Sequence, residues 1–451
     1  MTITTEQIRA MLADQALADN PFLHDGLSHG EVHALAAQLF RDLRQGPTGP
    51  VCLAAGQKPL MAASLLASLA GGPPLLLPYA TTRRALDQLR RAVPFSRMIT
   101  DDPGLALPGV SALSVAICEE KIPPLPTTCD PQRELLRIFT GGTTGSPQLW
   151  SKTGANLFGE ALFLCRHYRI TADDRILTTV PPHHIYGLLF SVLLPLVSGA
   201  SVIDRTPSFP AEIAETVRAC QPTILVAVPA HYRGLMHQPL PGDSLRLAFS
   251  SAGMLGELEN SAFSSHNSLG ITEVFGSTET GGIGERNRFG QQEHFTVFPI
   301  VDHRVRHGRL AVRSPFISPD LPVDEEGFFL TADRVKPCPD NSFVFTGRSD
   351  NITKVGGKRV DLDEIRALIL RQPEVSDCLL VALPEAGGRG HRIGGLVQGK
   401  DIVLAALYQR LRDDLPPQAV PKILKIVDRI PVRENGKYDR QAAIGLLSPC
   451  N

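Results

Sequence analysis

Short, mostly apolar segments alternate with longer stretches of helical periodicity in the first third of the chain. Val51–Ala54, Leu75–Tyr79 and Met98–Thr100 have the length and composition of short buried strands. Between them, Pro59–Leu69 and Thr82–Ala92 carry apolar residues at the spacing of one helix face. This alternation of strand and helix predicts a parallel sheet that is covered by helices on both faces.

A second series follows, with strands predicted at Ile224–Val228, Leu245–Phe249 and Ile271–Phe275 and a helix at Pro210–Cys220 before the first of them. In both series, glycine-containing breaks come directly after strands. Ligands of open α/β sheets sit beyond the carboxyl ends of the strands, so we expect a binding site at these breaks. The breaks are Gly141–Gly142, Ser251–Gly253 and Gly276.

The pattern changes after about residue 347. Asp361–Gln372 is amphipathic, with Asp361 or Asp363 available as a helix cap, and strands are predicted at Cys378–Leu383 and Ile393–Gln398 before a helix around Ile402–Arg412. About 100 residues in such a mixed pattern suit a small α+β domain. The predicted fold is therefore α/β: a large N-terminal domain of parallel-rich sheets covered by helices (1–347), a hinge (348–350) and a small mobile C-terminal α+β domain (351–451).

Composition excludes several classes of protein. The 451 residues are 43% hydrophobic and 20% charged, with a formal net charge of −1, so no overall field points to nucleic acid or to an anionic membrane. The eight cysteines include no Cys-x-x-Cys pair and no zinc-type spacing. The first residues, MTITTEQIRAML, do not have the pattern of a signal peptide, so we expect reduced thiols and a cytoplasmic location.

The run Ile185–Ile203 is uncharged and long enough to span a membrane. It contains Gly187, Pro195 and Gly199, and no excess of Lys or Arg flanks it. A buried helix followed by a short strand at Ala200–Ile203 explains the same residues. We therefore predict a buried segment of the α/β layers rather than a membrane span.

The segment Thr140–Pro147 (TGGTTGSP) combines three glycines with three threonine hydroxyls and follows an apolar run, Leu135–Phe139. Glycines allow backbone N–H groups to turn toward an anion, and a strand before the loop is the usual setting of a phosphate-binding turn. It is not a Walker loop, because no Gly-Lys-Ser/Thr closes it. A surface turn is the alternative explanation, since Gly/Thr turns are common.

Further segments resemble, in order and spacing, those of the adenylate-forming superfamily, which comprises acyl-CoA synthetases, aryl-CoA ligases and peptide-synthetase adenylation domains. The resemblance spans about Thr140 to Arg440. With Ser151-Lys152-Thr153 after the loop, the chain resembles the bacterial ligases that load aryl or acyl groups onto acyl carrier proteins in pigment and aryl-polyene pathways. The other matching segments are Pro182–Gly187, Phe275–Glu279, Thr331–Asp333, Gly347–Asp350, Lys354 with Gly356–Arg359, and Pro431–Lys437.

The resemblance implies that a carboxylate and ATP react to an acyl-adenylate and pyrophosphate, and that the acyl group then passes to a thiol. It assigns catalysis to Lys437, Glu279, Thr278 and His184, with Glu279 also holding Mg²⁺. It makes Asp350 the hinge at which the C-terminal domain rotates between the two half-reactions. The implied nucleotide-binding residues are Thr140, Gly141, Gly142, Thr143, Thr144, Gly145, Phe275, Gly276, Asp333, Arg348 and Arg359, and the implied acyl pocket is Tyr186, Ser251, Ala252, Gly253 and Ser277.

Without the resemblance, these residues have plainer explanations. Glu279 is then a solvated turn carboxylate, Asp333 and Arg348 a surface ion pair, and Lys437 one of many exposed lysines. The sequence also departs from the family. Gln148 and Leu149 replace the usual lysine and glycine, Ala332 replaces a glycine, and Asn351 stands where an aspartate is frequent. One hypothesis is that Lys152, four residues after Gln148, supplies the missing cation near the phosphates.

The thiol and the acid are less well defined by the sequence. A phosphopantetheine arm, on an acyl carrier protein or on coenzyme A, is the implied acceptor, and Gly356-Gly357 would admit it. Between Lys422 and Arg440, six basic and three acidic residues form a strip that suits either acceptor or is simply solvated. The other functional hypotheses are a nucleotide- or adenylate-binding pseudoenzyme and a luciferase-like oxygenase.

Overall fold

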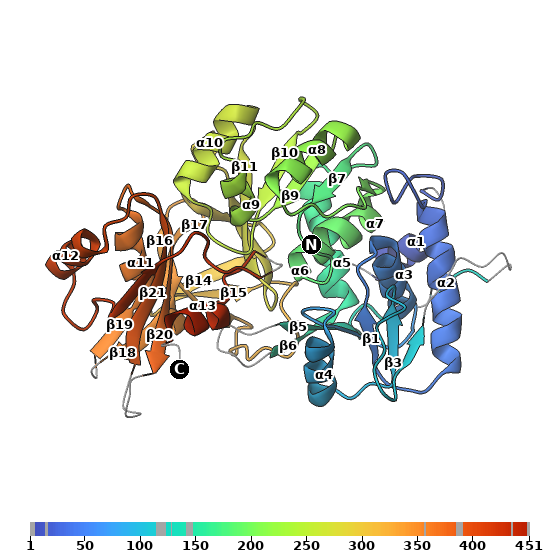
Figure 1. The fold of residues 1–451 in the computed structure, drawn as a ribbon. Helices are drawn as coiled ribbons and strands as arrows, with labels where there is room; N and C mark the ends of the chain where they lie inside the picture. The colour runs from blue at the N-terminus through green and yellow to red at the C-terminus, as the bar shows by residue number, and fades with distance from the viewer. Residues whose placement is uncertain are drawn as a thin grey trace. The chain divides into compact units, whose positions relative to one another are not determined.

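The computed structural model describes residues 5–13, 17–113, 123–127, 129–140, 148–355, 358–384, 391–433 and 436–448. The chain packs as two compact units (Figure 1). The first unit comprises Met1–Asp302 and Arg313–Asp324, and the second comprises His303–Val312 and Glu325–Asn451. The hinge predicted at 348–350 stays a prediction, because dividing the chain into compactly packed units does not identify where it bends.

The first sheet of unit 1 has the strand order β4-β3-β1-β2-β5-β6. Strands β1 to β5 pair in parallel, and β6 runs antiparallel to β5. Helix α3 is buried along its whole length, and α2 begins at a capping box of Ser28 and Glu31. The elements are α2 (His29–Gln45), β1 (Val51–Ala54), α3 (Lys58–Leu69), β2 (Leu75–Leu77), α4 (Arg83–Ala92), β3 (Arg97–Thr100), β4 (Ser111–Leu113), β5 (Glu134–Thr140) and β6 (Gln148–Thr153).

The strands of the second sheet that belong to unit 1 follow the order β13-β12-β11-β10-β9-β7-β8. Strands β7 to β11 pair in parallel, whereas β12 and β13 are antiparallel additions. Helices α8, α9 and α10 lie beside this sheet (Figure 1). The elements are β7 (Arg175–Thr178), β8 (Ser201–Val202), α8 (Pro210–Cys220), β9 (Ile224–Ala227), α9 (Pro229–Gly234), β10 (Leu247–Ser250), α10 (Glu257–Asn267), β11 (Ile271–Ser277), β12 (Gly281–Arg286), η2 (Arg288–Gly290) and β13 (Phe295–Val297).

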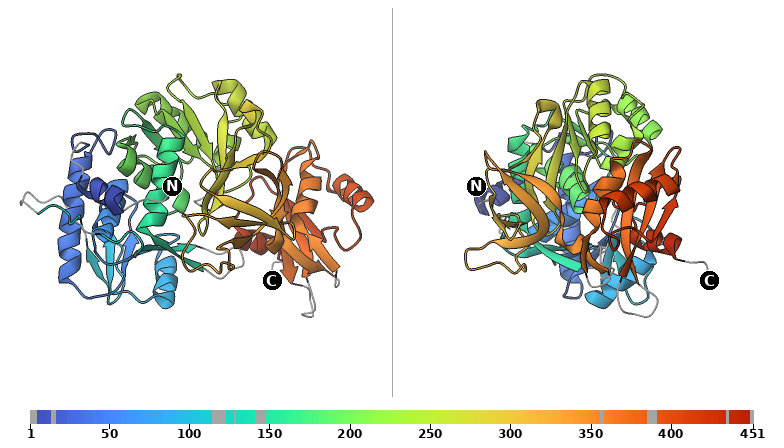
Figure 2. Two further views of the ribbon diagram at one scale, coloured as in Figure 1. Left: turned by 180° about the vertical axis from the view of Figure 1, so that it is seen from behind. Right: turned by 90° about the vertical axis from the view of Figure 1, so that its left-hand side faces the viewer.

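Helices lie between the two sheets of unit 1, and the left-hand view of Figure 2 shows this region from behind. The π-helical segment η1 contacts both α3 on one side and β7 on the other, and α5 contacts both β6 and β12. All five residues of η1 are buried and four of them are apolar, which suits a position between two layers. The elements are α5 (Gly154–His167), α6 (Ile185–Leu188), η1 (Leu189–Leu193) and α7 (Leu194–Ser198), with α1 (Thr5–Ala13) near the start of the chain.

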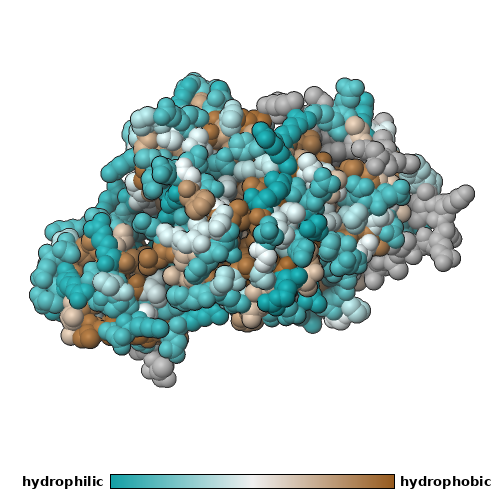
Figure 3. Space-filling view, turned by 90° about the horizontal axis from the view of Figure 1, so that it is seen from above, coloured by the Kyte–Doolittle hydropathy of each residue, from teal (hydrophilic) through white to brown (hydrophobic). Residues whose placement is uncertain are grey.

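The apolar run at 185–203 forms three short helical segments and the strand β8, where the sequence predicted one buried helix followed by a strand at Ala200–Ile203. Among the residues that the structure describes, no helix is both long and apolar enough to cross a membrane. On the face drawn in Figure 3, hydrophobic residues form small patches among hydrophilic ones. The described cysteines, Cys52, Cys129, Cys165, Cys220, Cys338 and Cys378, are all free thiols.

In unit 2, the strands β14-β15-β16-β17 pair in that order, and two small sheets have the strand orders β18-β19 and β20-β21-β22. Helix α11 packs on β20, and its side chains share a core with that sheet. Unit 2 is thus the small α+β part of the fold. Its elements are β14 (Asp302–Arg306), β15 (Arg309–Arg313), β16 (Phe329–Cys338), β17 (Ser342–Arg348), η3 (Ser349–Asn351), β18 (Ile352–Val355), β19 (Lys358–Asp361), α11 (Leu362–Leu370), β20 (Val375–Pro384), β21 (His391–Gly399), α12 (Leu404–Asp414), β22 (Ile423–Ile426) and α13 (Arg440–Leu447).

The predicted fold class is confirmed, and the corrections are confined to the ends of elements. The strand predicted to reach Tyr79 ends at Leu77, and the one predicted from Leu245 begins at Leu247. Asp361 is the cap of α11, accepting a hydrogen bond from the N–H of Asp363. Element ends depend on local hydrogen bonds that hydrophobic periodicity does not report, which explains these differences.

Unit 1 should lose stability in mild acid through His29, the first residue of α2. Burial, with the nearby His33, lowers the pKa of His29 from 6.5 to about 4. Between these values the unfolded chain binds a proton that the native protein does not, so acidification favours unfolding. From pH 7 to pH 5 this contributes about 2 kcal/mol, at about 1.4 kcal/mol per pKa unit.

The measurement is urea unfolding followed by the fluorescence of the single tryptophan, Trp150 on β6. His29→Gln should reduce the difference in unfolding free energy between about pH 7 and about pH 5. The matched control is His237→Gln, at an exposed histidine of the same unit, which should leave the difference unchanged. An unaltered pH dependence in His29→Gln would contradict the assignment.

Candidate functional site

The carboxyl ends of the parallel strands β7, β9, β10 and β11 meet at one edge of the second sheet. Ser251, Ala252 and Gly253 follow β10 there, and Ser277 ends β11. The hydroxyl of Ser251 donates to the carbonyl oxygen of Val274 at 2.8 Å, which ties the two strand ends together. Ala252 has φ +68°, a left-handed conformation that is uncommon for a residue with a side chain and is concentrated at functional sites.

Helix α6 carries Tyr186 to the same edge. The hydroxyl of Tyr186 donates to the carbonyl oxygen of Ala227 at the end of β9, at 3.3 Å. The ring packs edge-on against Phe190, 5.2 Å between centroids, and burial raises the pKa of Tyr186 well above its usual range. The structure thus brings the predicted pocket residues Tyr186, Ser251 and Ser277 to one strand edge, where α/β enzymes bind ligands.

His184 occupies the N-cap position of α6, with its ring 4.4 Å from that of His183 between centroids. The turn before it is tight: a Cβ on Gly187 would lie 2.1 Å from the carbonyl oxygen of Pro181. Only glycine fits at that position, so the chain direction from Pro181 into α6 is fixed by the sequence. This rigid turn holds His184 at the start of the helix.

Thr278 and Glu279 lie in the turn between the antiparallel strands β11 and β12, and both are half-buried. The hydroxyl groups of Ser277 and Thr280 lie 2.8 Å apart, and Ser277 also accepts from the N–H of Thr280 at 3.2 Å. A Cβ on Gly276 would lie 2.4 Å from the carbonyl oxygen of Gly281, so glycine is required for the two strands to approach. Phe275 packs against Phe295, 5.1 Å between ring centroids.

Lys152, on β6, lies beneath this turn with only 1% of its surface exposed. Its ammonium group donates to the carbonyl oxygens of Glu279 at 3.2 Å and Phe316 at 2.8 Å. Burial lowers the pKa of Lys152 to about 8, while burial raises the pKa of the nearby Glu160 carboxyl. An ammonium group directed into the protein core argues against the hypothesis that Lys152 is the missing cation at the phosphates.

In unit 2, Asp333 and Arg348 form an ion pair, the arrangement that the sequence offered as the alternative to ribose binding. Asp333 on β16 is 8% exposed and accepts from the guanidinium group of Arg348 at 3.0 Å. The same guanidinium group donates to both carboxylate oxygens of Asp350, at 2.9 and 2.7 Å. Burial by itself would raise the pKa of Asp350, but the hydrogen bonds and charge of Arg348 leave that pKa below its ordinary value.

The segment after Arg348 is held against helix α11. Asp363 accepts from the backbone N–H of Arg348 at 2.8 Å and from the amide of Asn351 at 2.9 Å. Arg440 donates to the side-chain oxygen of Asn351 at 2.9 Å. An amide at position 351 can accept from one group and donate to another, a pairing that the frequent aspartate of the family cannot make. Arg359, on β19, is exposed in the same unit.

Lys437 lies in a short hairpin with an exposed side chain. Val432 and Tyr438 form an antiparallel bridge, and the N–H of Arg433 donates to the carbonyl oxygen of Lys437 at 2.8 Å. The phenol of Tyr438 donates to the buried carboxylate of Asp377 at 2.6 Å. The residue next to Lys437 is therefore anchored in the core of unit 2, which fixes the backbone from which the lysine projects.

Several predicted residues lie outside the described part of the chain. They are Gly141, Gly142, Thr143, Thr144 and Gly145 of the predicted phosphate loop, and Gly356 and Gly357 between β18 and β19. Thr140 is described at the end of β5, where its hydroxyl donates to the carbonyl oxygen of Gln148 at 3.3 Å. The strands that flank the predicted loop are thus a paired antiparallel hairpin.

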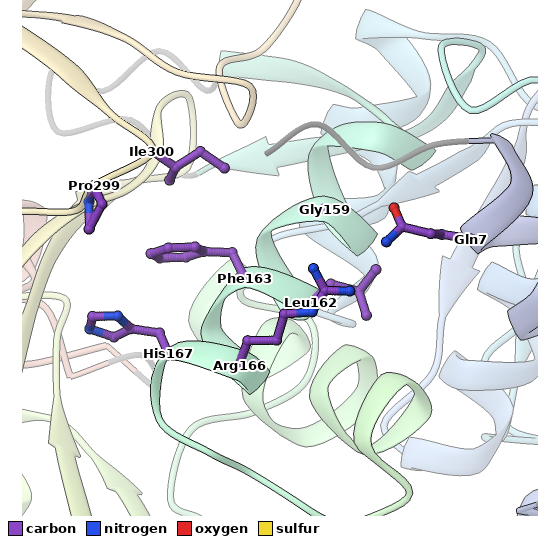
Figure 4. A pocket seen from close by; sticks show the side chains of 8 residues that line it. All are labelled: Gln7, Gly159, Leu162, Phe163, Arg166, His167, Pro299 and Ile300. Carbon is purple, nitrogen blue, oxygen red and sulfur yellow. The ribbon is translucent and has the colours of Figure 1, made fainter.

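A cavity of about 360 Å³ opens beside helix α5 in unit 1. Figure 4 shows the rings of Phe163 and His167 directed toward Pro299 and Ile300, with Gln7 approaching from α1. It shares no residue with the predicted acyl pocket. Within the described ranges, no cluster of three or more His, Cys, Asp or Glu side chains could hold a metal ion.

One residue at the strand edge was missed by the sequence reasoning. His231, in α9 after β9, has its Nδ1 atom 2.6 Å from the hydroxyl oxygen of Thr179, which follows β7. The rule that ligands bind beyond the carboxyl ends of parallel strands, which identified Ser251–Gly253, would also have found His231, because Val228-Pro229 marks the end of a strand. No local sequence pattern, by contrast, indicates that Lys152 and Glu160 contact the β11–β12 turn and the strand after it.

Comparison with known proteins gives consistent matches over nearly the whole chain. Residues 15–327 match the family described as AMP-binding enzyme, and residues 364–437 match the AMP-binding enzyme C-terminal domain. The chain is 28% identical to the p-hydroxybenzoic acid–AMP ligase FadD22 of Mycobacterium tuberculosis, over 96% of this chain and 68% of that protein. It is 29% identical to an anthranilate–CoA ligase of Pseudomonas aeruginosa, over 69% and 66%. Its fold is similar to that of ATP-bound MatB from Rhodopseudomonas palustris, with a TM-score of 0.80, 21% identity and 99% of both chains covered.

Proposed function

Because the chain belongs to the AMP-binding enzyme family and is an acid–thiol ligase, we propose that it activates an aromatic carboxylic acid as the acyl-adenylate and then transfers the acyl group to a phosphopantetheine thiol. In the first step a carboxylate oxygen attacks the α-phosphorus of ATP, and the bond from that phosphorus to the pyrophosphate oxygen breaks. In the second step the thiol sulfur attacks the acyl carbon, AMP leaves and the thiol proton is released.

The observation that carries this proposal is the strand edge that gathers Tyr186, Ser251 and Ser277 next to the turn of Glu279. Small residues at 251–253 and 277 leave room for a ring, and a buried neutral tyrosine offers an aromatic wall. Two relatives are named for p-hydroxybenzoic acid and anthranilate, which are both aromatic acids. An aromatic substrate is therefore the acid class that we propose, with His184 and His231 near the pocket.

Unit 1 and unit 2 contribute different residues to this proposal. The reaction brings two anions together, so positive charge and alignment matter more than proton transfer. In unit 1, Glu279 fits a Mg²⁺ ion, because Mg²⁺ is usually held by one or two carboxylates plus substrate phosphates and water. Such an ion neutralises charge on the phosphate oxygens. In unit 2, Asp333 and Arg348 are proposed for the ribose and Lys437 for the carboxylate and α-phosphate.

We narrowly favour an acyl carrier protein over coenzyme A as the acceptor, on the similarity of Ser151–Thr153 to carrier-protein ligases. The basic strip between 422 and 440 gives weaker support than the sequence suggested. Lys425 donates to the carbonyl oxygen of Leu446 at 2.6 Å, and Arg440 is engaged by Asn351. Arg433 lies 4.0 Å from Asp439. Three basic side chains of the strip are thus already engaged by partners within unit 2, and the acceptor must be decided by assay.

The test is exchange of labelled pyrophosphate into ATP with a panel of aromatic and fatty acids. We expect exchange with at least one aromatic acid and little with fatty acids, because exchange reports reversible adenylate formation. Exchange with no acid, from protein shown to be folded, would contradict the proposal and favour a nucleotide-binding pseudoenzyme. With the acid identified, thioester formation is compared between a pantetheinylated carrier protein and coenzyme A at equal concentrations.

A further inference from the structure

Two buried charged groups outside the assigned site hold the turn that carries Glu279. The Lys152 ammonium on β6 donates to the carbonyl oxygens of Glu279 and Phe316, at 3.2 and 2.8 Å. The carboxylate of Glu160, on α5, accepts from the backbone N–H of Gly282 at 2.7 Å. Both side chains are almost fully buried, with 1% and 4% of their surface exposed.

These contacts fix the turn at its middle and at its far end. The carbonyl oxygen of Glu279 accepts a second hydrogen bond from the N–H of Ser318 at 2.8 Å, so its peptide group has two donors. On the β12 side, a Cβ on Gly281 would lie 2.8 Å from a carboxylate oxygen of Glu160, so the strand and the carboxylate are in close contact. A turn whose peptide groups are held in this way presents its side chain in a fixed direction.

Packing alone does not explain a lysine at position 152. Burying an ammonium group is costly unless hydrogen bonds and opposite charge compensate, and an apolar chain of similar size would avoid that cost. The compensation here comes from two carbonyl oxygens and from the charge of Glu160. The ammonium group is thus placed where it acts on the backbone of Glu279.

We propose that Lys152 is a positioning residue that orients the Glu279 carboxylate for Mg²⁺–ATP through the Glu279 carbonyl, with Glu160 fixing the neighbouring strand. This inference rests on the proposed function, in which Glu279 holds Mg²⁺. It replaces the role considered for Lys152 at the phosphates. It also gives a reason for Lys152 after the predicted loop that does not depend on an acceptor protein.

The experiment uses a second buried lysine as its matched control. Lys58 is also 1% exposed, and its ammonium group donates to the carbonyl oxygens of Ile203, Asp204 and Arg205 at 2.5, 2.8 and 3.2 Å. It belongs to α3 and makes none of these bonds to the Glu279 turn. Lys152→Met and Lys58→Met therefore remove the same chemical group from comparable surroundings, and both should lower the melting temperature.

Pyrophosphate exchange is measured against free Mg²⁺ at fixed ATP. In Lys152→Met the half-saturating Mg²⁺ concentration should rise about tenfold, the lower end of the usual cost of losing a partner that orients a metal ligand. In Lys58→Met it should stay at the wild-type value. An unchanged Mg²⁺ dependence in Lys152→Met, or an equal rise in both variants, would overturn the inference.

A second variant keeps the test decisive if Lys152→Met does not fold. Lys152→Gln retains an amide donor without the charge, and a rise of about threefold is expected, smaller than for full loss of the partner; the wild-type value would overturn the inference. Failure of the proposed function is recognised separately, because wild-type protein would then show no exchange at any Mg²⁺ concentration.

Discussion

Lys437→Ala is expected to lower carboxylate-dependent pyrophosphate exchange by about 10²- to 10³-fold, the usual effect of removing one group that stabilises developing charge. The lysine projects from a hairpin that Tyr438 anchors to Asp377, so its backbone is fixed while the residue itself is exposed. In the proposed reaction it adds positive charge where the carboxylate meets the α-phosphate. That charge matters most when two anions are brought into contact.

The second half-reaction separates this role from a general loss of structure. Lys437→Ala should still transfer the acyl group from a preformed adenylate to the thiol, because that step needs no charge at the attacked phosphorus. Lys422→Ala, at another exposed lysine of the same strip, is the control and should retain both half-reactions. Survival of both half-reactions in Lys437→Ala would show that the assignment is wrong, and loss of both would point to misfolding or a different role.

Glu279→Gln should lower pyrophosphate exchange by about 10²-fold at moderate Mg²⁺ and raise the Mg²⁺ concentration needed for half the maximal rate. Glutamine has nearly the same size and keeps the backbone carbonyl that Lys152 and Ser318 bind, so the turn should be retained. Only the negative charge that attracts the cation is removed. A Mg²⁺ titration of the exchange rate therefore reports the carboxylate rather than the turn.

The matched control for this change is Glu285→Gln on the adjacent strand β12. Glu285 is also partly buried, and it accepts from the phenol of Tyr168 at 2.5 Å and lies 2.7 Å from the Nε2 atom of His167. Its substitution should affect the stability of unit 1 without changing the Mg²⁺ dependence. If Glu279→Gln keeps the wild-type Mg²⁺ dependence, then another group holds the cation and the assignment of Glu279 fails.

Combining the Lys152 and Glu279 substitutions in one protein tests whether Lys152 acts through Glu279. Glu279 provides the carboxylate, and Lys152 holds the peptide group that carries it. If both assignments are right, the Lys152→Met change should add little to a Glu279→Gln background, since the oriented carboxylate is already gone. Additive effects on the Mg²⁺ dependence would indicate that Lys152 acts on a different group.

Hydrophobic patterning determined the fold class because a buried strand or helix must present apolar residues at its own period. Val51–Ala54 and Pro210–Cys220 form the predicted elements at their predicted limits. The rule that ligands bind after parallel strands also located Ser251–Gly253 and the Glu279 turn, since strand order in such sheets places these ends on one edge. Ordered motifs then identified the family, which the domain matches confirmed.

The tertiary structure alone decided which groups meet across long distances in the chain. Lys152 contacts the carbonyl oxygen of Glu279, 127 positions away, and His231 lies beside Thr179, 52 positions away. No local period encodes such contacts, because they depend on how the sheets and helices stack. The sequence therefore determined the elements and the family, whereas the three-dimensional packing decided that Lys152 lies in the core beneath the turn that carries Glu279.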